Sequence, residues 1–272
     1  MGDRRVATYL DRIVAAHRQA ARADIRPLDG LIEEAWAQPP VRGFATALRS
    51  AAGLGVVAEV KRRSPSKGDL DAGLDAGLDP AVLARAYEEG GAACLSVLTD
   101  REFFGGSPDD LRDARRASAL PVLRKDFTVA AADVCDARTM GADAVLLIVA
   151  ALDDTELHDF HALATELGLD ALVEVHDEAE LDRALAAGAT LVGVNQRDLV
   201  TFEVDTTRAV RVGRALSDRG DVVRVAESGV RGPDDAAALA KAGFDAVLVG
   251  ESLVTSGDPA GAVRALRTAS AN

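Results

Sequence analysis

Ionisable residues stand at the ends of short apolar segments in this sequence, where they could act as acids and bases. Glu59 and Lys61 lie two residues apart, so on a strand their side chains would share one face. Lys125 and Glu174 each stand at the end of another apolar run. An unpaired charge among apolar residues is costly, so we expect these four side chains to converge and pair.

Convergence of this kind shifts pKa values. A lysine beside another lysine is expected to lose its proton more readily, and a glutamate shielded from water is expected to keep its proton. Such shifts produce acids and bases that work at neutral pH, so the pattern predicts general acid–base chemistry. A purely structural ring of ion pairs is the alternative.

Two glycine-containing segments are candidates for binding a phosphate group. Glu227-Ser228-Gly229 and Gly250-Glu251-Ser252 each offer a hydroxyl and backbone N–H groups that no side chain obstructs at glycine. The alternative is that these glycines only permit tight turns.

The loop Arg62–Gly68 (RRSPSKG) is the one basic cluster of the sequence. Because it follows Glu59 and Lys61, we interpret it as a mobile lid that carries cations to an anionic substrate, with Ser64 donating to a phosphate. A solvated loop or a nucleic-acid patch are the alternatives.

The histidines and cysteines form no constellation typical of a metal site or a nucleophilic triad. His158 and His161 are expected on the outside of one helix. The sequence indicates no partner for His17, and His176 is expected to begin a loop. Cys94 and Cys135 fall in apolar segments and are expected to be buried.

One pattern recurs along the chain: a helix-like stretch, a glycine, two small or polar residues and then an apolar run. Glycine ends helices because it adopts the left-handed conformation, and a short Val- and Leu-rich run is typical of a strand covered on both faces. The pattern starts at Gly91, Gly141, Gly168, Gly188 and Gly243. With three less regular segments it predicts eight strands, starting near residues 55, 93, 121, 143, 170, 190, 221 and 244.

Helices are predicted between these strands, among them residues 153–167, 177–187 and 233–242, and a last helix at about 258–269. Alternating strands and helices imply a parallel sheet, and eight regular units favour a closed (β/α)8 TIM barrel over a doubly wound sheet. No G-x-G-x-x-G follows the first strand.

The chain is expected to be a single domain of 272 residues. Residues 53–272 would form the barrel, and residues 1–52 would form a helical extension with helices at about 3–22, 29–37 and 43–51. In this fold the chemistry lies at the carboxyl ends of the strands, where the ionisable residues stand.

Composition excludes several classes of protein. The net charge of -13 argues against nucleic-acid and anionic-membrane partners, and no apolar run reaches the 18 or so residues that a bilayer requires. With no N-terminal signal segment and only two cysteines, a reducing cytoplasm is expected. We expect a monomer or a weak homodimer.

Eight ordered segments together resemble those of the indole-3-glycerol-phosphate synthases. The similarity covers roughly residues 5–267, and its E-x-K-x-x-S-P-S-x-G element is far more specific than a lone glycine motif. The segments are AEVKRRSPSKG (58–68), LSVLTD (95–100), FGGS (104–107), LRKDF (123–127), VEVH (173–176), GVNQRDL (193–199), AESG (226–229) and VGESL (249–253).

The resemblance implies that the chain closes the pyrrole ring of 1-(2-carboxyphenylamino)-1-deoxyribulose 5-phosphate, then releases carbon dioxide and water. It implies Lys125 as the general acid of ring closure and Asn195 as a residue that orients substrate hydroxyls. It implies that Glu174, Glu59 and Lys61 share the acid and base steps of dehydration and the binding of the substrate carboxylate. No metal or organic cofactor is implied.

The resemblance also implies a substrate-binding set. Arg197 would support the carboxylate end of the substrate. The residues of the phosphate cradle would be Ser64, Ser228, Gly229, Gly250 and Glu251, and the apolar walls around the aromatic ring would be Phe104, Phe127 and Leu146.

Two features depart from the family pattern. Gln196 stands where a small residue or Asn is more common, and we expect its side chain to point away from the site. Leu70–Asp79 contains a tandem Asp-Ala-Gly-Leu repeat that would lengthen the first loop and alter lid closure.

Three other functions remain open at this point. A Schiff-base aldolase would use Lys125 as an amine nucleophile, and a phosphoribosyl-sugar isomerase would share the phosphate loops. A barrel that only binds a ligand is the third.

Overall fold

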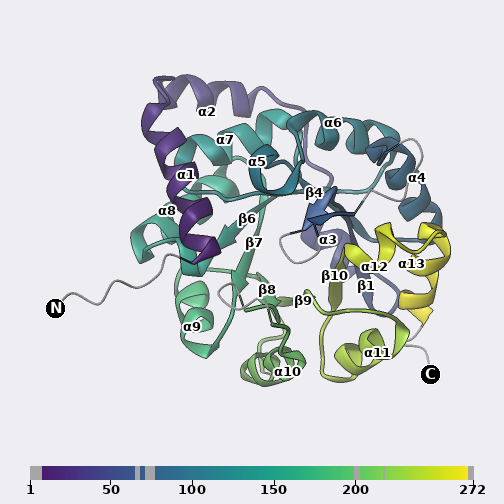
Figure 1. Cartoon of the computed structure of the whole chain (residues 1–272). Coiled ribbons are helices and arrows are strands. Elements are labelled where there is room, and N and C mark those ends of the chain that lie inside the picture. The colour runs from purple at the N-terminus through teal and green to yellow at the C-terminus, as the bar shows by residue number, and fades with distance from the viewer. Residues whose placement is uncertain (1–7, 65–67, 71–76, 199–202, 217, 269–272) are drawn as a thin grey trace.

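Eight parallel strands close into a barrel in the computed structural model, which describes residues 8–64, 68–70, 77–198, 203–216 and 218–268. Each strand pairs with its neighbours in chain order, and the first strand pairs with the last (Figure 1). The strands are β1 Gly55–Val60, β4 Cys94–Leu98, β5 Val122–Lys125, β6 Ala144–Ile148, β7 Asp170–Val175, β8 Leu191–Asn195, β9 Val223–Glu227 and β10 Ala246–Val249. The (β/α)8 barrel that the sequence predicts is confirmed.

Helices surround the barrel, and local signals in the sequence set their ends. Helix α4 begins after Asp79, whose side chain accepts from two backbone N–H groups, and it ends at Gly91 with φ of 82°. The helices between and after the strands are α4 Pro80–Gly90, α6 Pro108–Ala117, α7 Ala131–Met140, α8 Asp154–Glu166, α9 Glu178–Ala186, α10 Thr206–Ala215, α11 Pro233–Lys241 and α13 Pro259–Thr268. Three shorter helices are α5 Arg101–Phe104, η1 Val149–Ala151 and α12 Glu251–Val254.

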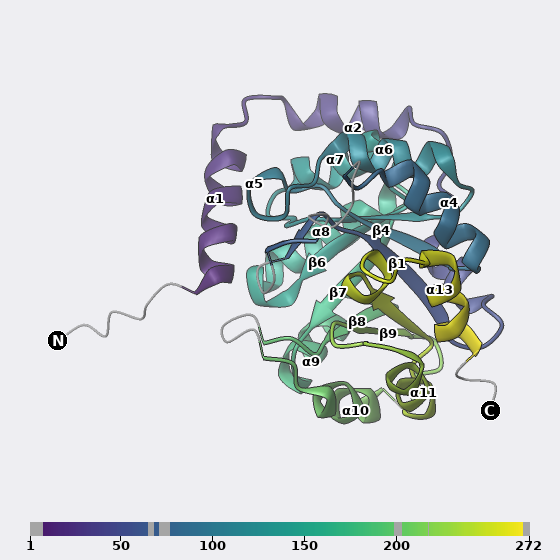
Figure 2. The ribbon, with the colours of Figure 1, turned by 45° about the vertical axis from the view of Figure 1, so that its right-hand side comes forward.

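Three helices precede the barrel: α1 Tyr9–Ala23, α2 Leu28–Trp36 and α3 Phe44–Arg49. They match the predicted ones, apart from the part of the first prediction that falls on residues 1–7, which lie outside the described residues. Figure 2 shows α1 standing beside the barrel, connected to it through α2. Helix α3 closes the amino ends of the strands, because its Ala45 N–H donates to Asp170, the first residue of β7.

Alternation along each strand separates two apolar clusters. In β1, Val56, Ala58 and Val60 pack outward against the helices, while Val57 packs inside the barrel with Phe44 and Leu48 of α3. Side chains two residues apart share a face, so the barrel interior is apolar near α3 and becomes ionisable toward the carboxyl ends of the strands.

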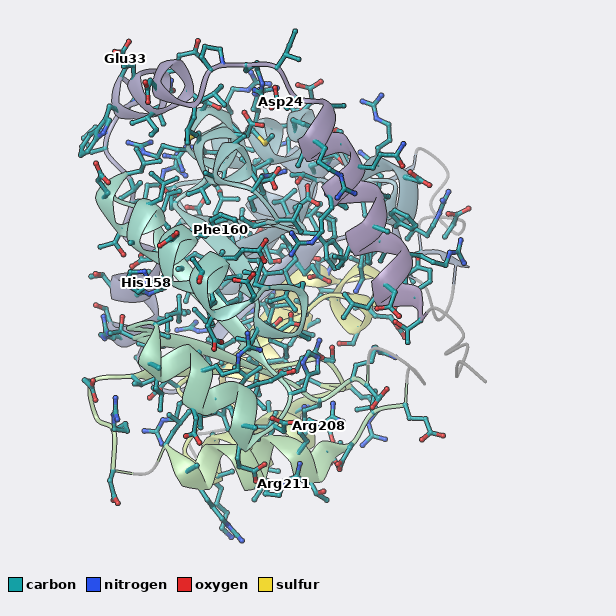
Figure 3. The ribbon with its side chains drawn as sticks, turned by 90° about the vertical axis from the view of Figure 1, so that its left-hand side faces the viewer. Asp24, Glu33, His158, Phe160, Arg208 and Arg211 are labelled. Carbon is teal, nitrogen blue, oxygen red and sulfur yellow. The ribbon has the colours of Figure 1, made fainter. Side chains whose placement is uncertain are left out.

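Both cysteines are buried, as the sequence predicts: Cys94 inside the barrel and Cys135 between sheet and helices. His158 lies on the outer side of α8, as expected (Figure 3). Within the described part of the chain, no helix is long and apolar enough to cross a membrane.

Candidate active site

The side chains that the sequence singled out meet in one cavity at the carboxyl ends of the strands, with a volume of about 840 Å³. All fifteen candidate residues line it: Glu59, Lys61, Ser64, Phe104, Lys125, Phe127, Leu146, Glu174, Asn195, Arg197, Glu227, Ser228, Gly229, Gly250 and Glu251. Residues from every strand of the barrel or the loops after them therefore contribute to a single site.

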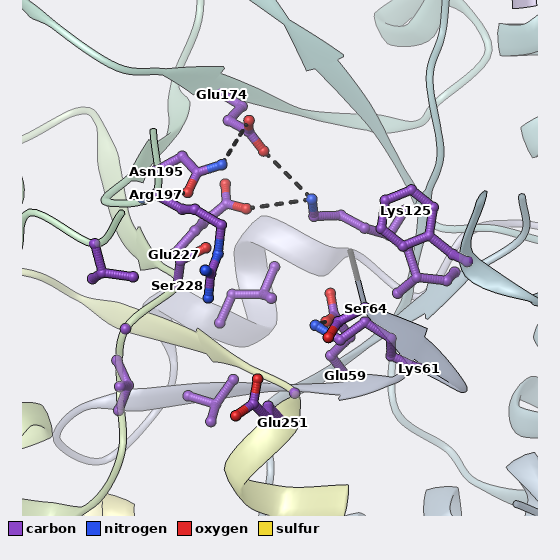
Figure 4. A pocket seen from close by; sticks show the side chains of 18 of the residues that line it. Glu59, Lys61, Ser64, Lys125, Glu174, Asn195, Arg197, Glu227, Ser228 and Glu251 are labelled. Atoms are coloured by element: carbon purple, nitrogen blue, oxygen red, sulfur yellow. Dashed lines mark hydrogen bonds and ion pairs between the residues drawn. The ribbon is translucent and has the colours of Figure 1, made fainter. Parts of the chain in front are cut away.

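Lys125 is the centre of a buried charge cluster (Figure 4). Its Nζ lies 3.4 Å from Oε2 of Glu174 and 3.7 Å from Oε2 of Glu227. The side chain of Lys125 is 17% exposed and those of the two glutamates 2%, so water screens these charges poorly. The structure places Glu227 with Lys125, whereas the sequence grouped it with the phosphate-binding residues.

Glu59 and Lys61 form a second ion pair at the end of β1, with Lys61 Nζ 2.7 Å from Glu59 Oε1. Ser96 donates to the other oxygen of Glu59 at 3.3 Å. Gly250 makes room for this carboxylate, because a Cβ at position 250 would lie 2.5 Å from Glu59 Oε1. Gly193 of β8 makes room for Glu227 in the same way.

Burial and neighbouring charges shift the pKa values of the groups in this cluster. Burial alone would lower the pKa of Lys125, but the charges of the surrounding glutamates, led by Glu174, raise it above its ordinary value. Burial would raise the pKa of Glu174, but Lys125 and then His176 hold it below its ordinary range. Burial, with the charge of Glu174, raises the pKa of Glu227 to about 8.

At neutral pH the cluster therefore holds a protonated Lys125, an ionised Glu174 and a neutral Glu227. The expectation that a neighbouring lysine lowers the pKa of Lys125 is wrong, because carboxylates outnumber amines around it. The expectation that a shielded glutamate keeps its proton holds for Glu227 and fails for Glu174, which faces the ammonium more closely.

Asn195 connects the cluster to the loop after β8. Its Nδ2 donates to Glu174 Oε1 at 3.0 Å, and its Oδ1 accepts from the backbone N–H of Arg197 at 3.0 Å. Both ends of the amide are used, so Asn195 has one orientation and fixes that of Glu174.

Ser228 and Gly229 form a tight turn after β9 in the cavity wall. Both have positive φ, 65° and 79°, and Ser228 is the one non-glycine among the described residues in this conformation. Gly250 follows the neighbouring strand β10, precedes the first turn of α12 and also lines the cavity. Backbone N–H groups in such turns and at helix starts favour anions.

The apolar wall lies on the other side of the barrel, where Phe104 and Phe127 stack with ring centroids 6.3 Å apart. Sequence reasoning missed that helix α1 completes this wall: Tyr9, Leu10 and Ile13 line the cavity. The apolar face of α1 was visible in the sequence, but the surface on which it docks was not.

His17 has partners that the sequence did not reveal. Its Nε2 lies 2.9 Å from Asp100 and 3.8 Å from Asp126, and its ring packs against Phe127 at 5.5 Å. Burial would lower the pKa of His17, but its hydrogen bond to Asp100 and the nearby carboxylates raise it. Asp100 also accepts from the first N–H groups of α5, and Asp126 accepts from Thr99 and Arg124.

His176 also lies closer to the chemistry than expected. Its Nε2 is 3.7 Å from Glu174 Oε1, and its Nδ1 is 3.0 Å from Glu180. Burial opposes its charge, but the hydrogen bond to Glu180 and the charge of Glu174 raise its pKa.

The predicted lid is only partly described. Arg63–Ser64 (β2) pairs with Gly68–Asp69 (β3) as an antiparallel ribbon, and residues 65–67 and most of the 70–79 insertion lie outside the described residues. Arg62 donates to Asp110 and Arg63 to Asp69, and neither lines the cavity. The described arginines of the loop, Arg62 and Arg63, are therefore directed away from the site.

Known proteins of one family match the sequence of this chain over nearly its whole length. The sequence model of the indole-3-glycerol phosphate synthase family matches residues 10–266. An indole-3-glycerol phosphate synthase from Mycolicibacterium smegmatis is 53% identical over 265 residues, 97% of this chain and 95% of its own length. One from a Nocardioides species is 58% identical over 214 residues, 79% of this chain and 80% of its own length.

Among solved structures, a thiamine phosphate pyrophosphorylase from Pyrococcus furiosus resembles this chain with a TM-score of 0.58 and 17% identity. The similarity covers 80% of this chain and 95% of that one, and it concerns the fold alone.

Proposed function

The chain belongs to the indole-3-glycerol phosphate synthase family, and from this premise we propose that it converts 1-(2-carboxyphenylamino)-1-deoxyribulose 5-phosphate to indole-3-glycerol phosphate. Carbon dioxide and water are the other products, so the enzyme is a carbon–carbon lyase of tryptophan biosynthesis. The observation that carries the proposal is the position of Lys125 between Glu174 and Glu227, in a cavity that also has the Ser228–Gly229 turn and an aromatic wall.

The positions of the residues around the cavity suit a substrate that is charged at one end and aromatic at the other. The turn at Ser228 and Gly229 follows β9, while Phe127 follows β5, four strands away around an eight-stranded barrel. A substrate phosphate at the turn and its aromatic ring against Phe104 and Phe127 would place the ribulose carbons between them, beside Lys125.

Ring closure joins the aromatic carbon that bears the carboxylate to the ketone carbon of the substrate. The ketone oxygen gains negative charge in this step and takes up a proton. Lys125 is protonated at neutral pH and donates to this oxygen, while its raised pKa also makes the ammonium a persistent electrostatic partner for the developing charge.

Loss of carbon dioxide then returns its bonding electrons to the ring and restores aromaticity. Dehydration follows: the new hydroxyl leaves as water with one added proton, and a base removes a proton from the adjacent carbon. Glu174 is ionised and is suited to the base role, and Lys61, paired with Glu59, is suited to hold the carboxylate and to protonate the hydroxyl.

We further propose that the enzyme works in the cytoplasm as a monomer or a weak homodimer, with a small phosphorylated substrate and no nucleic-acid or membrane partner. The net charge of -13 supports this view, since it opposes polyanionic surfaces.

The test is the rise of indole fluorescence after the purified protein is mixed with the substrate in the presence of EDTA. We expect turnover by the wild type, and a decrease of about 10³-fold or more in Lys125→Ala, because both the proton and the charge are lost. Lys241→Ala, an exposed lysine at the end of α11, is the matched control and is expected to leave turnover unchanged.

Absence of product with bound substrate would overturn the proposal. Treatment with borohydride and a carbonyl substrate would then test an aldolase, in which the Lys125 amine forms a Schiff base. The raised pKa of Lys125 argues against that chemistry, because a protonated amine is not a nucleophile.

A further inference from the structure

Gln196 lies between Asn195 and Arg197, yet its side chain points elsewhere. Its neighbours line the cavity, whereas the Gln196 residue is 1% exposed and lies behind the cavity wall. Its Nε2 donates a 2.7 Å hydrogen bond to the backbone carbonyl of Ser228. Since a carbonyl oxygen only accepts, the amide group has one favourable orientation. The side chain avoids the site, as the sequence predicts, but it contacts the backbone that forms the site.

This hydrogen bond determines which way the following peptide faces. The described residues contain no cis peptide bond, and in a trans peptide the C=O and N–H groups point in opposite directions. Because the Ser228 carbonyl points back to Gln196, the Gly229 N–H points forward to the cavity. Neither the Ser228 nor the Gly229 N–H donates to another described residue, so both are available to a ligand.

The turn requires an anchor because its conformation is unfavourable for serine. Ser228 has φ of 65°, where its Cβ crowds the backbone, so an unrestrained peptide would leave this conformation. Gln196 is itself fixed: its N–H donates to Glu227 at 3.0 Å, and its carbonyl accepts from Asp205 at 2.9 Å. A rigid donor is thus placed against the strained peptide.

We propose that Gln196 is a positioning residue for phosphate recognition, which holds the Ser228–Gly229 peptide so that its N–H faces the substrate phosphate. The inference deepens the proposed function and rests on it for the identity of the ligand. It also gives a role to a residue at which this sequence departs from the family pattern.

The experiment compares two probes, inorganic phosphate and the phosphate-free compound anthranilate, by calorimetry on the whole chain. In Gln196→Met, which keeps the side-chain length but cannot donate, we expect the Kd for phosphate to rise about tenfold, as loss of one hydrogen bond implies. We expect the Kd for anthranilate to be unchanged, and KM for the substrate to rise while kcat at saturation is kept. Gln19→Met, at an exposed glutamine of α1 that does not line the cavity, is the control.

Gln196→Glu gives the same test with a side chain of the same size that accepts instead of donating, and thermal unfolding checks that both variants fold. Unchanged phosphate affinity in a folded variant, equal loss for both probes, or failure of both variants to fold would overturn the inference.

The two proposals fail in distinguishable ways. If the wild type forms no indole product but its phosphate affinity depends on Gln196, the proposed function is wrong and the positioning role stands. If the wild type turns over and Gln196→Met is indistinguishable from it, the positioning role alone is wrong.

Discussion

Glu227 illustrates how position within the barrel sets the chemistry of a side chain. It is one of three glutamates beside Lys125, but it keeps its proton at neutral pH, because burial and the charge of Glu174 raise its pKa to about 8. Above that pH a new negative charge forms beside Lys125, which strengthens the hold on the lysine proton and makes it a weaker acid.

We therefore predict that kcat falls above a pH of about 8 in the wild type and that this step is absent from Glu227→Gln, which is neutral at every pH. The measurement is kcat between about pH 6 and 10. Glu166→Gln, an exposed glutamate of α8, is the control and should keep the wild-type profile. The same inflection in Glu227→Gln would assign it to another group.

Gly193 has no side chain and thereby leaves room for the carboxylate of Glu227. A Cβ there would overlap Oε1 of Glu227, which is buried and has no hydrogen-bond partner among the described residues. Gly193→Ala is predicted to displace this carboxylate and to lower kcat by about 10²-fold, the order expected for a misplacement of about 1 Å.

Gly220→Ala serves as the control for Gly193→Ala, because nothing lies within 4 Å of a Cβ at position 220. Circular dichroism and thermal unfolding would show that both variants fold. Wild-type kcat in a folded Gly193→Ala would mean that the position of Glu227 does not matter for the chemistry.

At the scale of elements, helix α1 is held beside the cavity by charge as well as by apolar packing. Arg18 donates to Glu156 of α8 at 2.7 Å, and His17 pairs with Asp100 after β4. The folded state raises the pKa of His17. Its stabilising effect is therefore fully present below the ordinary pKa near 6.5 and is lost as pH rises through the raised value.

His17→Gln is predicted to lower the free energy of unfolding by about 1 kcal/mol or more at pH 6 and by clearly less at pH 9. Urea unfolding at the two pH values is the measurement. His158→Gln, an exposed histidine on α8, should have little effect at either pH. Equal losses at pH 6 and 9 for His17→Gln would show that the charge of His17 contributes nothing.

The raised pKa values of His17, His176 and Glu227 all change the stability of the whole molecule in the same direction as pH changes. Each group binds more protons in the folded state than in the unfolded state, so stability falls as pH rises through neutrality. Above the pI near 4.8 the net negative charge, -13 at pH 7, also causes self-repulsion, and this lowers stability further as pH rises.

We predict that the unfolding temperature is highest on the acid side of neutrality and decreases between about pH 6 and 9. Salt separates the two causes, because it screens repulsion between surface charges more than proton binding at buried groups. The decrease should therefore persist at 0.5 M or so of salt with a smaller slope. An unfolding temperature that rises over this range would contradict the prediction.

The sequence by itself determined the order of the elements and the end of the barrel at which the polar residues lie. Asp79 and Gly91 fix the ends of α4 through contacts within a few residues, and alternation along β1 fixes the inward face of Glu59. These signals are local, so they can be read without knowing which segments meet in space.

Only the tertiary structure decided which charges share a proton and which helix closes the site. Glu174 and Glu227 both end apolar strands, yet one is ionised and the other neutral, because their distances to Lys125 and to each other depend on the closure of the barrel. The docking of α1 through His17 and the support of Ser228 by Gln196 join residues 83 and 32 positions apart. Electrostatic energies depend on distances in space, and spacing along the chain does not contain them.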